Sequence, residues 1–148
     1  MSRTDDERAL AHKMPQVARK WRQLADHMLA EFGVSNSAGW CLIYLDRLGP
    51  DARQADIAEE LGITQPSLVR TLHQLQAAGL VERVAHPDDR RSNKVALTPE
   101  GQRLVGRIET RLADLRHELL DGVPDAAIEI AVNLLNLLEQ RMTDRRGR

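Results

Sequence analysis

Gly62-Ile-Thr-Gln-Pro-Ser-Leu-Val-Arg-Thr-Leu-His-Gln-Leu75 is the stretch that decides the fold of this chain. Thr64 is a good N-cap, and Pro66 falls in the first turn of a helix, where its missing N–H group costs nothing. The stretch therefore predicts a helix over 65–78. A shorter apolar pattern over 57–61 precedes it, across a turn that contains glycine. Two short helices joined by such a turn indicate a helix-turn-helix.

A β-hairpin is expected directly after this helix pair. Strand-like alternation occurs in two short segments, 80–85 and 94–97. Between them lies His86-Pro-Asp-Asp-Arg-Arg-Ser-Asn93, a polar loop rich in turn-forming residues. Thr98 and Pro99 then indicate the start of another helix. A helix-turn-helix followed by a hairpin with a charged tip is typical of a winged helix.

Longer helical patterns flank this unit on both sides. Apolar residues recur at steps of three and four over 9–32, 40–48, 99–121 and 125–142, and Ser35 or Ser37 can cap the second of these helices. Because no repeat, low-complexity stretch or flexible linker interrupts the chain, we expect one domain over 1–148. Within it we expect a helical frame and a winged helix-turn-helix lobe, the frame over 9–49 and 99–143 and the lobe over 53–98. The predicted fold class is mainly α with a small β-hairpin.

Composition limits the function classes. At 148 residues, with 42% hydrophobic side chains, the chain can bury an ordinary core without disulfide or metal. The only cysteine, Cys41, excludes an intrachain disulfide and a zinc cluster. The N-terminus is charged and no run reaches about 20 apolar residues, which predicts a cytoplasmic protein. A net charge of −1 means that DNA binding must come from local basic patches.

The helix over 65–78 has a polar face without acidic residues, formed by Gln65, Ser67, Arg70, Thr71, His73 and Gln74. Arginine pairs with guanine and glutamine with adenine, each pair giving about 1–3 kcal/mol of discrimination. Ser67 and Thr71 are better suited to phosphate contacts. A solvated helix face is the alternative reading. The hairpin that follows favours DNA, so we predict DNA-binding roles for Gln65, Ser67, Arg70, Thr71 and Gln74.

The hairpin tip carries a second candidate patch. Arg90, Arg91 and Lys94 are positive, against Asp88 and Asp89. An arginine held out on a thin hairpin can enter a narrow minor groove, and Asp89 can orient the Arg91 guanidinium. A surface loop of weak salt bridges is the alternative. We predict that Asp89, Arg90 and Arg91 contact DNA.

Three segments resemble the MarR family of bacterial transcription regulators: 62–75, Gly79-Leu-Val-Glu-Arg83 and Asp89-Arg-Arg-Ser-Asn-Lys-Val-Ala-Leu-Thr-Pro-Glu-Gly101. The wing pattern, Asp-x-Arg followed by Leu-Thr, is fairly specific to that family. The run Pro66-Ser-Leu-Val-Arg-Thr-Leu72 is similar to the SlyA branch in particular. So are Trp21-Arg22, Asp26-His27 and Trp40 in the first two helices. The likeness covers about residues 10–143.

The resemblance implies an intertwined homodimer with the element order α-α-α-α-β-β-α-α, in which each winged unit reads half of a palindrome. The long apolar stripes of 9–32 and 104–142 agree with burial by a partner. The resemblance also implies that a small aromatic acid such as salicylate weakens DNA binding. Candidate pocket residues are Arg19, Trp21, Trp40 and Tyr44, since arginine can hold a carboxylate beside an aromatic wall. Ordinary core or surface roles for these residues are the alternative.

No pattern of an enzyme is present in the sequence. The five histidines form no metal-ligand spacing, and no glycine-rich phosphate loop or nucleophile elbow occurs. We therefore expect no catalytic residue, metal or cofactor. A redox role for Cys41 is disfavoured by its apolar neighbours, and a buried inert thiol is preferred. The sequence predicts a sequence-specific DNA-binding regulator, with an architectural or protein-binding winged helix without an effector as the alternative.

Overall fold

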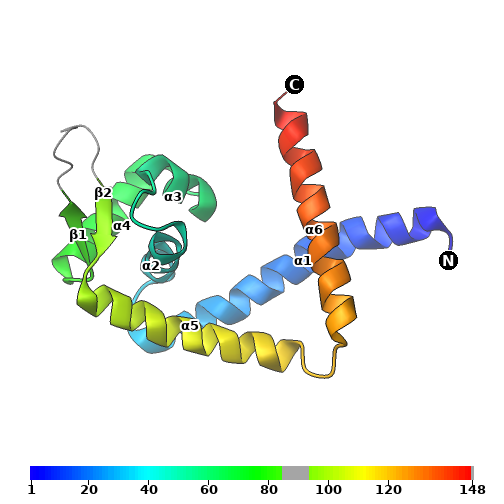
Figure 1. Ribbon diagram of the computed structural model, residues 1–148, viewed down its shortest axis with the longest axis horizontal. Coiled ribbons are helices and arrows are strands. Elements are labelled where there is room, and N and C mark those ends of the chain that lie inside the picture. Colours follow the sequence, from blue (N-terminus) through cyan, green and yellow to red (C-terminus); the bar gives the residue numbers. More distant parts are fainter. Residues whose placement is uncertain (85–93, 148) are drawn as a thin grey trace. The chain divides into compact units, whose positions relative to one another are not determined.

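The computed structural model describes residues 1–84 and 94–147 (Figure 1). The first unit of the chain begins with four helices and a two-stranded hairpin: α1 Arg3–Leu29, α2 Asn36–Leu48, α3 Gln54–Leu61, α4 Gln65–Ala77, β1 Val81–Val84 and β2 Lys94–Leu97. Two helices follow, α5 Pro99–Leu119 and α6 Asp125–Arg146, and a short 3-10 helix, η1 Ala30–Phe32, separates α1 from α2. This order confirms the predicted mainly helical fold with a hairpin wing. Two compact units divide the chain, Met1–Ala113 and Asp114–Arg148.

The expected capping residues start α2 and α4. Of the two serines considered for α2, Ser35 is the cap, and its Oγ accepts the N–H of Ala38 at 3.2 Å. The Oγ1 of Thr64 accepts the N–H of Ser67 at 3.3 Å in the same way. Each cap satisfies a backbone donor that has no partner inside the helix.

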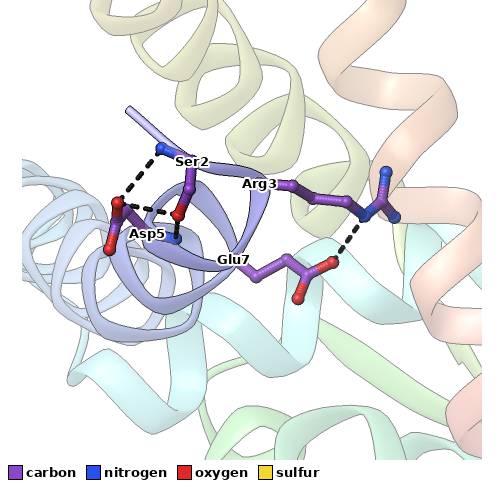
Figure 2. Close-up of polar contacts among 4 residues, drawn as sticks. All are labelled: Ser2, Arg3, Asp5 and Glu7. Atoms are coloured by element: carbon purple, nitrogen blue, oxygen red, sulfur yellow. Dashed lines mark hydrogen bonds and ion pairs between the residues drawn. The ribbon is translucent and has the colours of Figure 1, made fainter.

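The first helix begins at Arg3, six residues before the predicted range of 9–32. Ser2 and Asp5 form a capping box, in which the Ser2 Oγ accepts the Asp5 N–H at 3.3 Å and the Asp5 carboxylate accepts the Ser2 N–H at 3.1 Å (Figure 2). One turn along, Arg3 pairs with Glu7 at 2.8 Å. These polar contacts extend the helix beyond its apolar stripe. Because they involve no apolar residue, apolar periodicity does not predict this extension.

The core of the first unit packs α4 against α2, α3 and the base of the hairpin. Fully buried side chains come from each of the three helices, including Leu42, Ile57, Leu68 and Leu75. Burying a side chain of this size contributes about 1.5–3 kcal/mol. The buried side of α4 is thereby fixed, which determines the face that it presents to solvent.

The two strands pair antiparallel, with Val81 opposite Leu97 and Val84 opposite Lys94. Val81 is buried, whereas Val84 is exposed near the start of the loop. The strand pair therefore anchors the wing to the core at one end only.

A close backbone contact joins the hairpin to the start of α5. The Thr98 N–H donates to the Leu80 carbonyl at 3.1 Å, and the Thr98 Oγ1 donates to the Gly79 carbonyl at 2.6 Å. The same Oγ1 accepts the Gly101 N–H at 3.1 Å, which confirms Thr98 as the helix cap. A Cβ atom at Gly101 would overlap the Leu80 carbonyl oxygen. Glycine is therefore required at position 101 for α5 to start beside the hairpin.

The second unit consists mainly of α6. No side chain of this helix is buried, and its exposed apolar residues include Ile130, Leu135 and Met142. Within the described ranges, no helix has the length and apolar character needed to cross a membrane.

Candidate nucleic-acid interface

The exposed face of α4 carries four of the five side chains of this helix that are predicted to contact DNA. Gln65, Arg70 and Gln74 are exposed, and Ser67 is half-buried. The opposite face supplies Leu68, Leu72 and Leu75 to the core. No residue of α4 is acidic, so this face presents hydrogen-bond donors and a positive charge to solvent.

Thr71 does not lie on that face. Its side chain is buried, at 7% exposure, and its Oγ1 donates to the Ser67 carbonyl at 3.1 Å. The placement of Thr71 on the polar face is therefore wrong. Positions three and four residues apart on a helix are neighbours, and two such neighbours of Thr71, Leu68 and Leu75, are buried. The hydroxyl is satisfied inside the helix, so Thr71 presents no donor to DNA.

Ser67 organises the N-terminal half of the polar face. Its Oγ accepts a hydrogen bond from the Thr64 Oγ1 at 3.0 Å and another from the Arg70 Nη2 at 3.3 Å. The guanidinium of Arg70 is thus held near the first turn of α4 by a neutral partner. The positive end of the helix dipole lies at this same end, which favours an approaching phosphate.

Arg83 of β1 also belongs to this surface, although the sequence reasoning did not select it. Its Nη2 donates to the Nε2 of His73, on α4, at 3.0 Å. Alternate residues of a strand share a face, so Arg83 lies on the same side of β1 as the buried Val81, the side that packs on α4. That alternation was the available signal for finding Arg83.

Lys94 lies at the loop end of the strand pair, opposite Val84. Its Nζ pairs with the Asp51 Oδ1 at 3.1 Å, which ties the start of β2 to the connection between α2 and α3. An exposed pair of this kind contributes about 0–1 kcal/mol. Lys94 was predicted to add a positive charge to the hairpin tip, but its ammonium group is paired with the Asp51 carboxylate.

Three of the predicted contacts, Asp89, Arg90 and Arg91, lie outside the described residues. Their roles in DNA binding stay predictions.

The four candidate effector-binding residues do not form one cluster in the structure. Trp40 and Tyr44 lie together on α2, with ring centroids 6.3 Å apart. Trp40 is buried and donates from its Nε1 to the Asp26 Oδ1 at 2.7 Å. The guanidinium carbon of Arg22 lies 3.7 Å from the centroid of the Trp40 ring.

Arg19 and Trp21 lie on α1 and are not part of this cluster. Arg19 is exposed, and Trp21 is 36% exposed. Across residues 1–84 and 94–147, no hydrogen bond, ion pair or ring contact links either side chain to Trp40 or Tyr44. The arginines at the aromatic pair are Arg22, over Trp40, and Arg47, whose guanidinium carbon lies 5.8 Å from the centroid of the Tyr44 ring.

Cys41 is fully buried in α2. Burial raises the pKa of its thiol to about 12, because the apolar surroundings disfavour the thiolate. A sensor cysteine needs an accessible thiolate. The expectation that the thiol is buried is confirmed.

Comparison with known proteins shows a match to the MarR family over residues 32–92. Among solved structures, the chain is similar to transcriptional regulator PA3341, with 28% identity over 91% of this chain and 98% of that one, and a TM-score of 0.84. It is also similar to MepR of Staphylococcus aureus in complex with DNA, with 26% identity over 88% of this chain and 94% of that one, and a TM-score of 0.69.

A third similar structure is MarR of Staphylococcus aureus in complex with salicylate and kanamycin. Its identity is 16% over 93% of each chain, at a TM-score of 0.80, so this likeness supports the fold alone. The family match covers the helix-turn-helix, whereas the structural match to PA3341 covers 91% of the chain. Proteins of this family are transcription regulators, which confirms the expectation that the chain is not an enzyme. The chain has the winged helix-turn-helix fold of MarR transcription regulators, and its residues 32–92 match the MarR family.

Proposed function

We propose that this protein is a homodimeric regulator of the SlyA-like branch that binds a near-palindromic operator in the cytoplasm. A small aromatic carboxylate such as salicylate changes its affinity for that operator. In this proposal the single domain 1–148 is divided by role. Regions 9–49 and 99–143 form the dimerisation frame, and region 53–98 reads DNA.

The exposed face of α4 is the observation that carries the proposal. Arg70 is held by a neutral hydroxyl and keeps its charge for a guanine or a phosphate. Gln65 and Gln74 are exposed and suit adenine edges. We propose that Ser67 fixes the register of the helix on the backbone, and that Asp89, Arg90 and Arg91 contact the adjacent minor groove.

The dimer is supported by apolar surface that the single chain leaves uncovered. On α1, Leu10, Val17 and Leu24 are 41%, 55% and 48% exposed and follow one another at seven-residue spacing. On α6, Ile130 and Leu135 are 68% and 52% exposed. Apolar stripes of this length are unusual on a monomer and typical of a subunit interface. A second copy of the chain covers them in our proposal.

The effector part of the proposal rests on the aromatic pair and on a relative. MarR of Staphylococcus aureus is known in complex with salicylate. Here Trp40 and Tyr44 provide an aromatic wall, and Arg19 and Trp21 lie on the neighbouring helix α1. The structure adds Arg22, which already stacks on Trp40. A ligand carboxylate that binds Arg22 must compete with Asp26, whose Oδ1 lies 3.4 Å from the Arg22 Nε.

Selection of duplexes from a random pool tests the proposed function. A sequence-specific dimer enriches a motif that repeats with two-fold symmetry, and it holds that motif against excess competitor DNA. Binding without enrichment favours the architectural alternative. Absence of duplex binding favours a protein-interaction module.

A further inference from the structure

We propose that Arg83, on the first strand of the wing, binds a phosphate of the DNA backbone and that His73 positions it for this contact. The proposal rests on DNA binding by α4 and extends the interface to a residue outside the recognition helix and the wing tip. The hydrogen bond from the Arg83 Nη2 to the His73 Nε2, at 3.0 Å, is the contact that points to it.

The path of the Arg83 side chain fits this role. It begins on the α4-facing side of β1 and lines a small hollow with Val69 and Gln76 of α4. The guanidinium then reaches His73, which is exposed. Packing of the stem restricts the side chain, while the charged end remains at the surface. A guanidinium has five N–H donors, and His73 occupies one of them.

The acceptor of the Arg83 hydrogen bond is an uncharged imidazole nitrogen, so this bond does not cancel the positive charge of Arg83. The Nε2 of His73 can accept a hydrogen bond only while it carries no proton. Several other basic side chains of the chain pair with carboxylates, namely Arg3, Arg22, Arg47, Lys94 and Arg111. A carboxylate cancels most of the charge of its partner, whereas an imidazole orients a guanidinium and leaves its charge available. Arg70, held by Ser67, is arranged in the same way.

Charges near Arg83 also favour an anion. Helix α4 has no acidic residue, and Glu82, the one carboxylate of β1, lies on the opposite side of the strand by alternation. Arg70 and His73 are three residues apart and therefore neighbours on the helix surface. Arg83 thus continues the row of donors from α4 onto β1.

The salt dependence of duplex binding tests the role of Arg83. Each phosphate contact adds about 0.9 to the slope of log affinity against log salt concentration. We expect Arg83→Ala to lower the slope by about that amount. It should also reduce the affinity for selected duplexes and for random duplexes by the same factor. Arg83→Lys should keep the slope, because it keeps the charge. Arg3→Ala, which removes an exposed arginine paired with Glu7, is the matched control and should leave the slope unchanged.

A double-mutant cycle tests the role of His73. His73→Ala should weaken binding when Arg83 is present and have no further effect in the Arg83→Ala background. His73→Gln should retain most of the affinity, since its amide oxygen can accept the same bond. Additive effects of the two alanine substitutions would overturn the positioning role. If Arg83→Ala loosens the hairpin, as thermal unfolding would reveal, Arg83→Gln repeats the test with a neutral side chain of similar length.

A wild-type slope in Arg83→Ala would overturn the phosphate contact. If Arg70→Ala loses affinity in the same assays, DNA binding by α4 stands and only the Arg83 proposal fails. If the wild-type protein shows neither salt dependence nor duplex binding, the proposed function itself fails.

Discussion

Arg22 stacks on Trp40, with 3.7 Å between its guanidinium carbon and the ring centroid, and both side chains donate to the Oδ1 of Asp26. This arrangement links α1 to α2 through one carboxylate. The Trp40 indole is buried, so its N–H needs an internal acceptor, and Asp26 supplies it. An effector carboxylate that approaches Arg22 would therefore compete with the Asp26 carboxylate.

We predict that salicylate weakens operator binding and that operator DNA weakens salicylate binding by the same factor, as linkage requires. A tenfold effect corresponds to about 1.4 kcal/mol of coupling. Calorimetric titration of salicylate into the free protein and into the operator complex measures both affinities. Equal affinities in the two titrations would eliminate effector control.

Two arginine variants identify the residue that holds the carboxylate. From the structure we expect Arg22→Ala to weaken salicylate binding more than Arg19→Ala, because Arg22 stacks on Trp40 and the described residues show no such contact for Arg19. Both variants should bind the operator normally when ligand is absent. The reverse ranking would support the sequence-based choice of Arg19.

Gly101→Ala should destabilise the protein by about 1–3 kcal/mol, because the added methyl group overlaps the Leu80 carbonyl and the wing junction must shift. Gly106→Ala is the matched control in the same helix, where a Cβ meets no atom within 4 Å. It should stabilise the protein by about 0.5–1 kcal/mol through helix propensity. Urea unfolding compares the two variants, and equal effects would contradict the close contact at Leu80.

The Cys41 thiol should resist alkylation in the native protein at pH 8 and react once urea unfolds the chain. Because burial raises its pKa to about 12 from an ordinary value of 9.0, the neutral thiol is favoured in the folded state. The stability that this contributes is complete below about pH 9 and is lost as the pH rises toward 12. Iodoacetamide labelling with mass spectrometry measures the protection. Rapid labelling of native protein would contradict the burial.

Arg70→Ala should cost about 1–3 kcal/mol of operator affinity and relax the preference at one base pair, if Arg70 reads guanine. Thr71→Val is the control from the same helix. Because Thr71 is buried and bonds to the Ser67 carbonyl, its replacement should leave DNA affinity within about twofold. Titrations against operator variants at one fixed salt concentration measure both. A large loss of affinity in a stably folded Thr71→Val would restore Thr71 to the interface.

Local signals in the sequence predicted the elements well. Caps and glycine turns act on backbone hydrogen bonds within a few residues, so the sequence alone predicts their effect. Examples are the caps Thr64 and Thr98 and the turn at Gly62. The strand range 94–97 was correct for the same reason. The extension of α1 was missed, because the Ser2–Asp5 capping box lies outside any apolar pattern.

The site was predicted less completely, because it depends on which side of an element meets its neighbour. Thr71 lies at the border of the apolar stripe of α4, and a polar residue there was assigned to the wrong side. Arg22 and Arg83 act across elements, on Trp40 and His73, through contacts between residues 18 and 10 positions apart. Alternation along β1 can place Arg83 on the side that packs on α4, but spacing within one helix or strand cannot show which residue of another element it contacts.

Footprinting of the selected operator, combined with sedimentation of the complex, tests the central claim most directly. We predict that two copies of the 16.7 kDa chain bind one duplex and protect two half-sites centred about one helical turn of DNA apart. The two-fold axis of the protein should coincide with that of the operator. A single copy that protects one half-site would contradict the account.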